Sequence, residues 1–202
     1  MAITLTWTGP VGPGRFPDES ETLEAMQASG VYLRVKVYDG DLVVGYVGRS
    51  RNVLLRIDQH LMGLVSLQQT LRDQTGKIVS RGDFSDRIAA YNNIDSVMAM
   101  AAGDASRTRF YVAFCGETFD SDCLNLVEAA LKDRMEEIAK MGAGLIDCEN
   151  RQGVVGDPFA GVVRIESDPS ALDSDHAEIV ERLIGAEAIE IAEAILGLGY
   201  AH

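Results

Sequence analysis

The sequence predicts an α+β fold, a small three-stranded sheet of mixed or antiparallel strands flanked by helices. A β-hairpin is expected near residues 31–48, where two β-type segments flank a turn, and a third strand is expected near 109–115. Amphipathic periodicity predicts helices near 52–62 and 122–141. With 202 residues, 47% of them hydrophobic, the chain can form one sizeable core and scarcely two.

An N-terminal extension, residues 1–29, precedes this core. Residues 3–7 favour a short strand, and residues 9–14 are expected to form a loop because they include three glycines and two prolines. A phosphate-binding loop is disfavoured there, since no Lys-Ser or Lys-Thr pair follows the glycines.

The first hairpin strand, Val31–Val37, alternates as a half-buried strand does. Its aliphatic side chains are expected in the core, and Tyr32, Arg34 and Lys36 on the opposite side. The turn residues Asp39–Asp41 lead into a second strand, Leu42–Val47.

A helix follows the hairpin, with Ser50 or Asn52 suited to cap its first turn. Arg56 and His60 are four residues apart, so they lie together on its polar face. The opposite face carries an apolar stripe formed by Val53, Leu54, Ile57 and Leu61.

Residues 61–109 are interpreted as a helical insertion, with helices at 64–74 and 85–102 and the second ended by Gly103. The insertion either covers one face of the sheet or places basic side chains within reach of a DNA backbone. These basic residues are Arg72, Lys77, Arg81, Arg87, Arg107 and Arg109.

The C-terminal segment, residues 161–202, is interpreted as an acidic helical extension. Its helix is expected to start at Asp175, with Glu178 completing a capping box, and to continue through Ile195. The apolar stripe of this helix must pack on its own subunit or on a second copy, so a homodimer is one expected arrangement.

Charge is distributed unevenly along the chain. The net charge of −13 argues against a nucleic-acid partner at first sight. Residues 30–112, however, carry 11 basic and 8 acidic side chains, against 7 and 23 in the remainder, which leaves room for a local basic face.

Three cysteines without CxxC spacing suggest neither a disulfide framework nor a zinc site. Without a signal-peptide pattern or a bilayer-length apolar run, we expect a cytoplasmic protein.

Two tripeptides on the hairpin strands, Gly30-Val31-Tyr32 and Tyr46-Val47-Gly48, resemble the signature tripeptides of the GIY-YIG nuclease family. Arg56 follows Gly48 by eight residues, as the catalytic arginine of that family does, and His60 stands where members often carry His or Tyr.

Two residues nearer the C-terminus extend the resemblance. Glu128 resembles the metal-binding glutamate of the family, and Asn150 resembles its closing asparagine. The resemblance covers roughly residues 30–155, and the nuclease-like domain is assigned to 30–160.

The resemblance implies a metal-dependent endonuclease that hydrolyses phosphodiester bonds in DNA. Glu128 would hold Mg²⁺ or Mn²⁺ through oxygen, and Arg56 would donate to the transition-state phosphate. A tyrosine would help to deprotonate water, and we favour Tyr32, assisted by His60, over Tyr46, which would position water or phosphate. The remaining expected site residues, in contact with substrate or holding the site in register, are Gly48, Arg49, Ser50 and Asn150.

Each of these residues also has an ordinary structural explanation, such as strand packing for a tyrosine or a turn for Asn150. Three readings therefore remain open. The first is an active endonuclease, the second an inactive nucleic-acid-binding or regulatory module on the same fold, and the third an unrelated α/β protein. A separation of more than about 10 Å between the tyrosines and Glu128 would favour the third. The DNA sequence recognised, and DNA against RNA, stay undecided.

Overall fold

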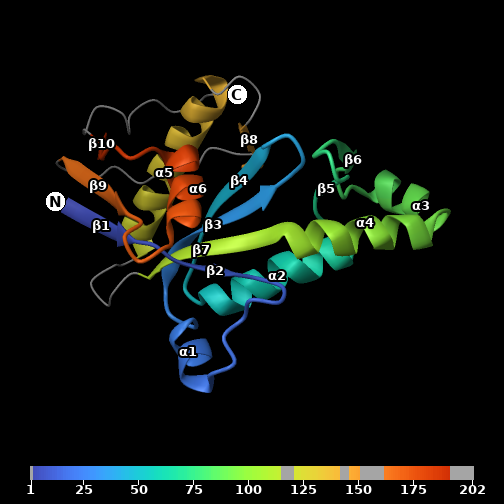
Figure 1. Cartoon of the computed structure of the whole chain (residues 1–202), viewed down its shortest axis with the longest axis horizontal. Helices are drawn as coiled ribbons and strands as arrows, with labels where there is room; N and C mark the ends of the chain where they lie inside the picture. Colours follow the sequence, from blue (N-terminus) through green and yellow to red (C-terminus); the bar gives the residue numbers. More distant parts are fainter. Residues whose placement is uncertain (1, 115–120, 142–145, 151–161, 192–202) are drawn as a thin grey trace.

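The centre of the molecule is a five-stranded mixed sheet (Figure 1). The computed structural model describes residues 2–114, 121–141, 146–150 and 162–191. All neighbouring strands of the sheet are antiparallel except β8, which runs parallel to β4. In spatial order the strands are β2 (Thr8–Val11), β7 (Thr108–Phe114), β3 (Gly30–Val37), β4 (Val43–Ser50) and β8 (Ile146–Cys148).

The α+β class is confirmed, whereas the expected sheet of three strands is too small. The three predicted strands are the middle of the sheet, β7-β3-β4, and β2 and β8 extend it at the two edges. β2 was missed because Gly9 and Pro10 are poor strand residues. They occur here in an edge strand, where the N–H that proline lacks is not needed for pairing on the outer side.

The predicted hairpin is confirmed as β3 and β4, and its pairing places Tyr32 opposite Gly48 and Arg34 opposite Tyr46. Its turn is tight because Gly40 and Asp41 both adopt positive φ angles, of 78° and 62°. The expectation of a half-buried β3 is wrong, since the whole strand except its last residue is buried. Arg34 is 6% exposed and Lys36 1% exposed, because helices cover both faces of the sheet.

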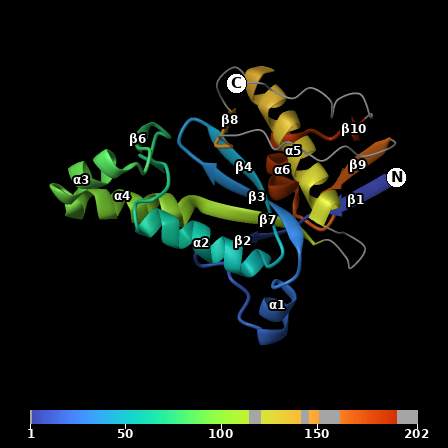
Figure 2. The ribbon, with the colours of Figure 1, turned by 180° about the vertical axis from the view of Figure 1, so that it is seen from behind.

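One face of the sheet is covered by α5 (Ser121–Met141) and α6 (Ser174–Ile184). The other is covered by α2 (Val53–Val65), which lies along α4 (Ile94–Arg107), as Figure 2 shows. Aliphatic residues of β3 and β4 pack with α5 and α6 in the larger core cluster, whereas Tyr32 packs with α2 in a second cluster. Alternation along β3 therefore assigns successive side chains to two different cores.

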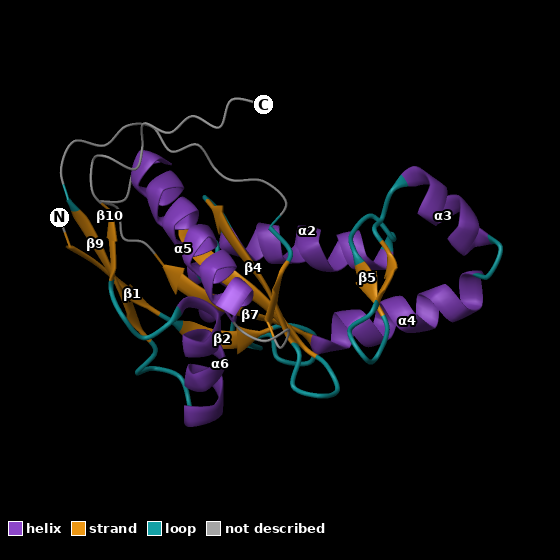
Figure 3. Cartoon of the chain, turned by 90° about the horizontal axis from the view of Figure 1, so that it is seen from above, coloured by secondary structure: helices purple, strands orange, loops and turns teal. Residues whose placement is uncertain are grey.

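The two terminal extensions meet in a second sheet. Its strands are β1 (Ala2–Thr6), β9 (Val163–Asp168) and β10 (Ile189–Ile191), with β1 parallel to β9 (Figure 3). Side chains of β1 and β9 belong to the same core cluster as the central hairpin. The described parts of the two extensions, residues 2–29 and 162–191, thus belong to one packed body with the central hairpin.

The predicted insertion forms an arm that extends from this body (Figures 1 and 3). The helix expected at 64–74 is wrong, because α2 ends at Val65 and a short hairpin follows. The helix expected at 85–102 is two helices, separated at Asn92 and Asn93, and the second passes through Gly103. The new elements here are β5 (Leu71–Arg72), β6 (Ile78–Ser80) and α3 (Phe84–Tyr91), and α1 (Ser20–Ala25) precedes the central hairpin.

The C-terminal helix is shorter than predicted and is capped differently. Asp173 caps α6 by accepting a hydrogen bond from the amide of His176, so the capping box at Asp175 and Glu178 is wrong. α6 ends at Gly185, whose φ of 75° favours glycine, and Ile191 lies in β10. Ile195 lies outside the described residues.

The apolar stripe of α6 packs against its own chain. Val180, Leu183 and Ile184 are buried in the larger core cluster, so this stripe provides no surface for a second copy. Within the described ranges, no helix has both the length and the apolar character needed to cross a membrane.

Candidate active site

The two signature tyrosines and the α2 residues Arg56 and His60 meet on one face of the hairpin. Asn52 caps α2, since its side chain accepts a hydrogen bond from the amide of Leu55 at 2.9 Å. The Tyr32 hydroxyl lies 2.7 Å from Nε2 of His60 and accepts from Nε of Arg56 at 3.3 Å. The predicted common face of Tyr32, Tyr46 and Arg56 is therefore confirmed.

The aromatic rings of this group pack closely. The ring centroids of Tyr32 and Tyr46 are 6.2 Å apart, and the Tyr46 centroid lies 5.2 Å from that of His60. Burial lowers the pKa of Arg56, but its hydrogen bonds with Tyr32 and Tyr46 outweigh this effect and raise it. Arg56 thus stays a cation beside both tyrosines.

Gly48 makes room for Tyr32 on the neighbouring strand. A Cβ added at Gly48 would overlap Oη and Cζ of Tyr32. Gly48 was expected to allow close approach either to a phosphate or to the start of the helix, and the structure shows its open side filled by a tyrosine of the same protein. The strand pairing that faces Gly48 with Tyr32 explains why the two signature tripeptides belong together.

A polar pocket of about 410 Å³ opens beside the hairpin. Its lining includes four basic side chains, Arg34, Arg56, Arg81 and Lys132, and one carboxylate, Glu149. Tyr46, His60, Gln68, Gln69, Thr70 and Asn150 complete it. The excess of cations over carboxylates favours an anionic ligand.

The structure favours Tyr46 over Tyr32 as the phenol that meets a ligand. Tyr46 is partly exposed and lines the pocket, whereas Tyr32 is 0% exposed and does not line it. Burial and the nearby Tyr46 raise the pKa of Tyr32 far above its usual range, despite Arg56 and Arg34. A buried phenol with a raised pKa is a poor base, so the assignment of Tyr32 to that role does not fit the structure.

Glu128 joins the pocket through its ion pairs. Its Oε1 lies 3.1 Å from Nζ of Lys132, and its Oε2 accepts from Nε of Arg49 at 3.1 Å. Lys132 lines the pocket one helical turn after Glu128. The segments described hold no group of three or more His, Cys, Asp or Glu side chains suited to a metal ion. Glu128 can therefore offer a divalent cation one carboxylate, as in sites where water and substrate phosphate supply the other ligands.

Asn150 has the positioning role that the resemblance implies. Its Oδ1 accepts from the amide of Val47 at 2.9 Å, and its Nδ2 donates to the carbonyl of Val47 at 2.8 Å. Both groups belong to the stretch of β4 that extends beyond its pairing with β8. Ser50 makes a local turn instead, since its hydroxyl bonds both the amide and the carbonyl of Asn52.

No family model, curated protein or solved structure matches this chain. Support for a function therefore comes from the geometry of the site and from the resemblance of its motifs.

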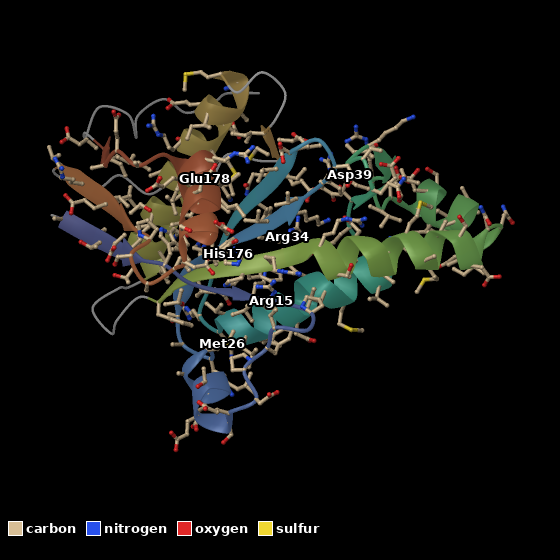
Figure 4. The ribbon with its side chains drawn as sticks, in the orientation of Figure 1. Arg15, Met26, Arg34, Asp39, His176 and Glu178 are labelled. Atoms are coloured by element: carbon tan, nitrogen blue, oxygen red, sulfur yellow. The ribbon has the colours of Figure 1, made fainter. Side chains whose placement is uncertain are left out.

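Sequence reasoning missed a buried polar network beneath the tyrosines. Arg34, labelled in Figure 4, donates to Gln69 and, at 2.5 Å, to Glu149, and its Cζ lies 4.8 Å from the Tyr46 ring centroid. Arg72 donates to the other oxygen of Glu149 at 3.0 Å and to Asp147 at 2.6 Å. Arg72 was one of the basic residues that could have reached a DNA backbone, but it is buried in these ion pairs.

One signal in the sequence could have indicated this network. Arg34 and Lys36 alternate on a strand with Tyr32, so any cover over that face would bury charges that need partners. Glu149, beside Asn150, is one such partner, and Asp104 is the other, with Oδ2 2.7 Å from Nζ of Lys36.

Proposed function

We propose that this protein is a metal-dependent endonuclease that hydrolyses phosphodiester bonds in DNA. The observation that carries the proposal is the meeting of Tyr46, Arg56 and Lys132 in one basic pocket, with Glu128 bound to Lys132 at its rim. These residues lie on three separate elements, β4, α2 and α5. A chance match of motifs gives no reason for them to gather around one pocket.

Phosphate binding is the first task of the pocket. Arg56 presents a planar guanidinium suited to two oxygens of one phosphate, and Lys132 adds a compact charge. Charge that builds on those oxygens in the transition state is stabilised by donors already held in place. The net charge of −13 opposes the approach of DNA, so binding would have to rely on local cations such as those of the pocket.

Activation of water falls to Tyr46 in this proposal. Its ring is held against His60 and under the guanidinium of Arg34, with Arg56 beside it. Because Tyr46 lines the pocket, it is the tyrosine that would take a proton from the attacking water.

Glu128 would hold Mg²⁺ or Mn²⁺, with water and a phosphate oxygen filling the remaining positions. When bound, the cation supplies Lewis-acid polarisation of the scissile phosphate. Lys132 and Arg49 neutralise the carboxylate of Glu128 in the free protein. When a phosphate and a metal ion bind, Lys132 would exchange its ion pair with Glu128 for one with the phosphate.

A second candidate function is an inactive nucleic-acid-binding or regulatory module. It is favoured by the ion pairs at both oxygens of Glu128, which a divalent cation must displace. Incubation with supercoiled plasmid and Mg²⁺ or Mn²⁺, with EDTA as control, separates the two. Metal-dependent nicking or linearisation supports the endonuclease, and plasmid binding without any cleavage supports the inactive module.

A cytoplasmic site of action fits this proposal. Cys148 is a free cysteine, the state that a reducing compartment maintains. Cys115 lies outside the described residues. Duplex cleavage by one active site requires two encounters or a second subunit, and a homodimer would have to use a surface other than α6.

A further inference from the structure

The buried polar network contacts His60 on the side away from Tyr32. Nη1 of Arg34 lies 3.0 Å from Nδ1 of His60, and Nε2 of Gln69 lies 3.2 Å from the same nitrogen. Arg34 is held there by Glu149, whose carboxylate is also bound by Arg72. His60 is itself 4% exposed, so these protein groups replace water around its ring.

The chemistry of these partners decides where the imidazole proton lies. A guanidinium only donates hydrogen bonds, so Nδ1 of His60 must accept from Arg34. The amide of Gln69 agrees, because its oxygen accepts from Arg34 and its NH₂ group therefore faces Nδ1. A neutral imidazole with an accepting Nδ1 carries its proton on Nε2, the nitrogen 2.7 Å from the Tyr32 hydroxyl.

We propose that Arg34 is a positioning residue that holds His60 as the neutral Nε2–H tautomer and makes Tyr32 accept a hydrogen bond from it. The tautomer of His60 is inferred independently of the proposed function, and only its importance for catalysis rests on that function. His60 in this form cannot take the proton of Tyr32, so the pair acts as a rigid support for the ring of Tyr46. The oxygen of Tyr32 then receives two N–H donors, from His60 and Arg56.

Every charged group facing His60 supports this state. Burial, followed by the positive charges of Arg34, Arg56 and Lys36, lowers the pKa of His60 to about 3. Glu149 is the nearby carboxylate, and it is engaged by the guanidinium groups of Arg34 and Arg72. Protonation of Nδ1 would place a new N–H against a guanidinium that has no lone pair to receive it.

Long-range ¹H–¹⁵N NMR of histidine-labelled full-length protein reports the tautomer and charge of His60 directly. A His60→Gln sample identifies its signals among the three histidines. We expect the Nε2–H pattern, unchanged between about pH 5 and pH 9. A charged ring or an Nδ1–H pattern in the wild-type protein would overturn the inference.

Two buried arginines of the same network provide the variant and its control. Arg34→Met removes the donor to Nδ1, so we expect mixed tautomers and a titration midpoint raised by about one pH unit or more. Arg72→Met breaks contacts with the same Glu149 but touches no atom of His60, so the Nε2–H pattern should persist. An unchanged pattern in folded Arg34→Met refutes the role of Arg34.

Loss of the Nε2–H pattern of His60 in folded Arg72→Met would refute the claim that Arg34, and not the network as a whole, sets the tautomer. If Arg34→Met does not fold, the wild-type spectrum still decides the tautomer. Folded Arg34→Lys then tests, by the same His60 signals, whether the planar guanidinium of Arg34 is needed to hold the Nε2–H form. These readouts require no cleavage, so an inactive protein would refute the proposed function and leave this inference standing.

Discussion

Replacing Gly48 by alanine tests the packing that joins the two signature tripeptides. The added Cβ would overlap Oη and Cζ of Tyr32 and lie 2.9 Å from Cε1 of Tyr46. Tyr32 is completely buried and is held by His60 and Arg56, so its ring has no free space to enter. Overpacking of this kind costs about 1–3 kcal/mol.

Urea unfolding followed by circular dichroism measures this cost. For an m-value of about 2 kcal/mol/M, the midpoint should fall by about 0.5 to 1.5 M in Gly48→Ala. The matched control is Gly103→Ala, where the only neighbour within reach of an added Cβ is the flexible end of Arg107, at 3.2 Å. Alanine within α4 should stabilise the protein by about 0.5 to 1 kcal/mol. A Gly48→Ala protein as stable as wild type would refute the close packing of Tyr32 against this strand.

Three further changes test the charged groups of the site. Arg56→Ala should lower kcat for plasmid cleavage by about 10²–10³, as expected for loss of a preorganised transition-state donor; an undiminished rate would exclude that role. Lys132→Met should strengthen Mn²⁺ binding to DNA-free protein, measured by electron paramagnetic resonance, by at least about 5-fold, because it removes a cation beside Glu128. Exposed Lys140→Met on the same helix should leave this affinity unchanged. Burial alone would raise the pKa of Glu149, but its basic partners lower it overall, so its stabilising effect is present at neutral pH and lost as pH falls below about 4. Glu149→Gln should therefore lose about 3–5 kcal/mol in urea unfolding at pH 7, with a smaller deficit in acid; an equal deficit at both pH values would contradict this linkage.

The elements that could be predicted from sequence are those with strong local patterns. The sequence of β3 alternates along its length and is followed by a Gly-Asp turn, and α2 combines an asparagine cap with an apolar stripe. α5 begins and ends where its periodicity predicts. Because the spacing of Tyr32, Tyr46, Arg56 and His60 is set by these local elements, their common face followed from the sequence as well.

The parts that could not be predicted depend on partners distant in the chain. Arg34 is bound by Glu149, 115 positions away, and Lys36 by Asp104, so neither burial nor pairing is visible in the local pattern. β10 is a short segment that becomes a strand only by pairing with β9. By contrast, the short strand expected at residues 3–7 is confirmed as β1. The same dependence explains why Tyr32 was preferred over Tyr46, since local sequence does not reveal which ring faces the pocket.

Cleavage of supercoiled plasmid by Glu128→Gln is the most direct test of the central claim, that one metal-assisted site hydrolyses DNA. Glutamine keeps the shape of the side chain and removes the charge that would hold the cation. The control is Glu136→Gln, on the same helix, whose carboxylate is partly exposed and 4.0 Å from Lys140. Circular dichroism and a DNA-binding assay confirm that both variants remain folded and bind plasmid. The account predicts Mg²⁺-dependent cleavage by the wild type and by Glu136→Gln, and none by Glu128→Gln. Cleavage by Glu128→Gln at a near wild-type rate would contradict it.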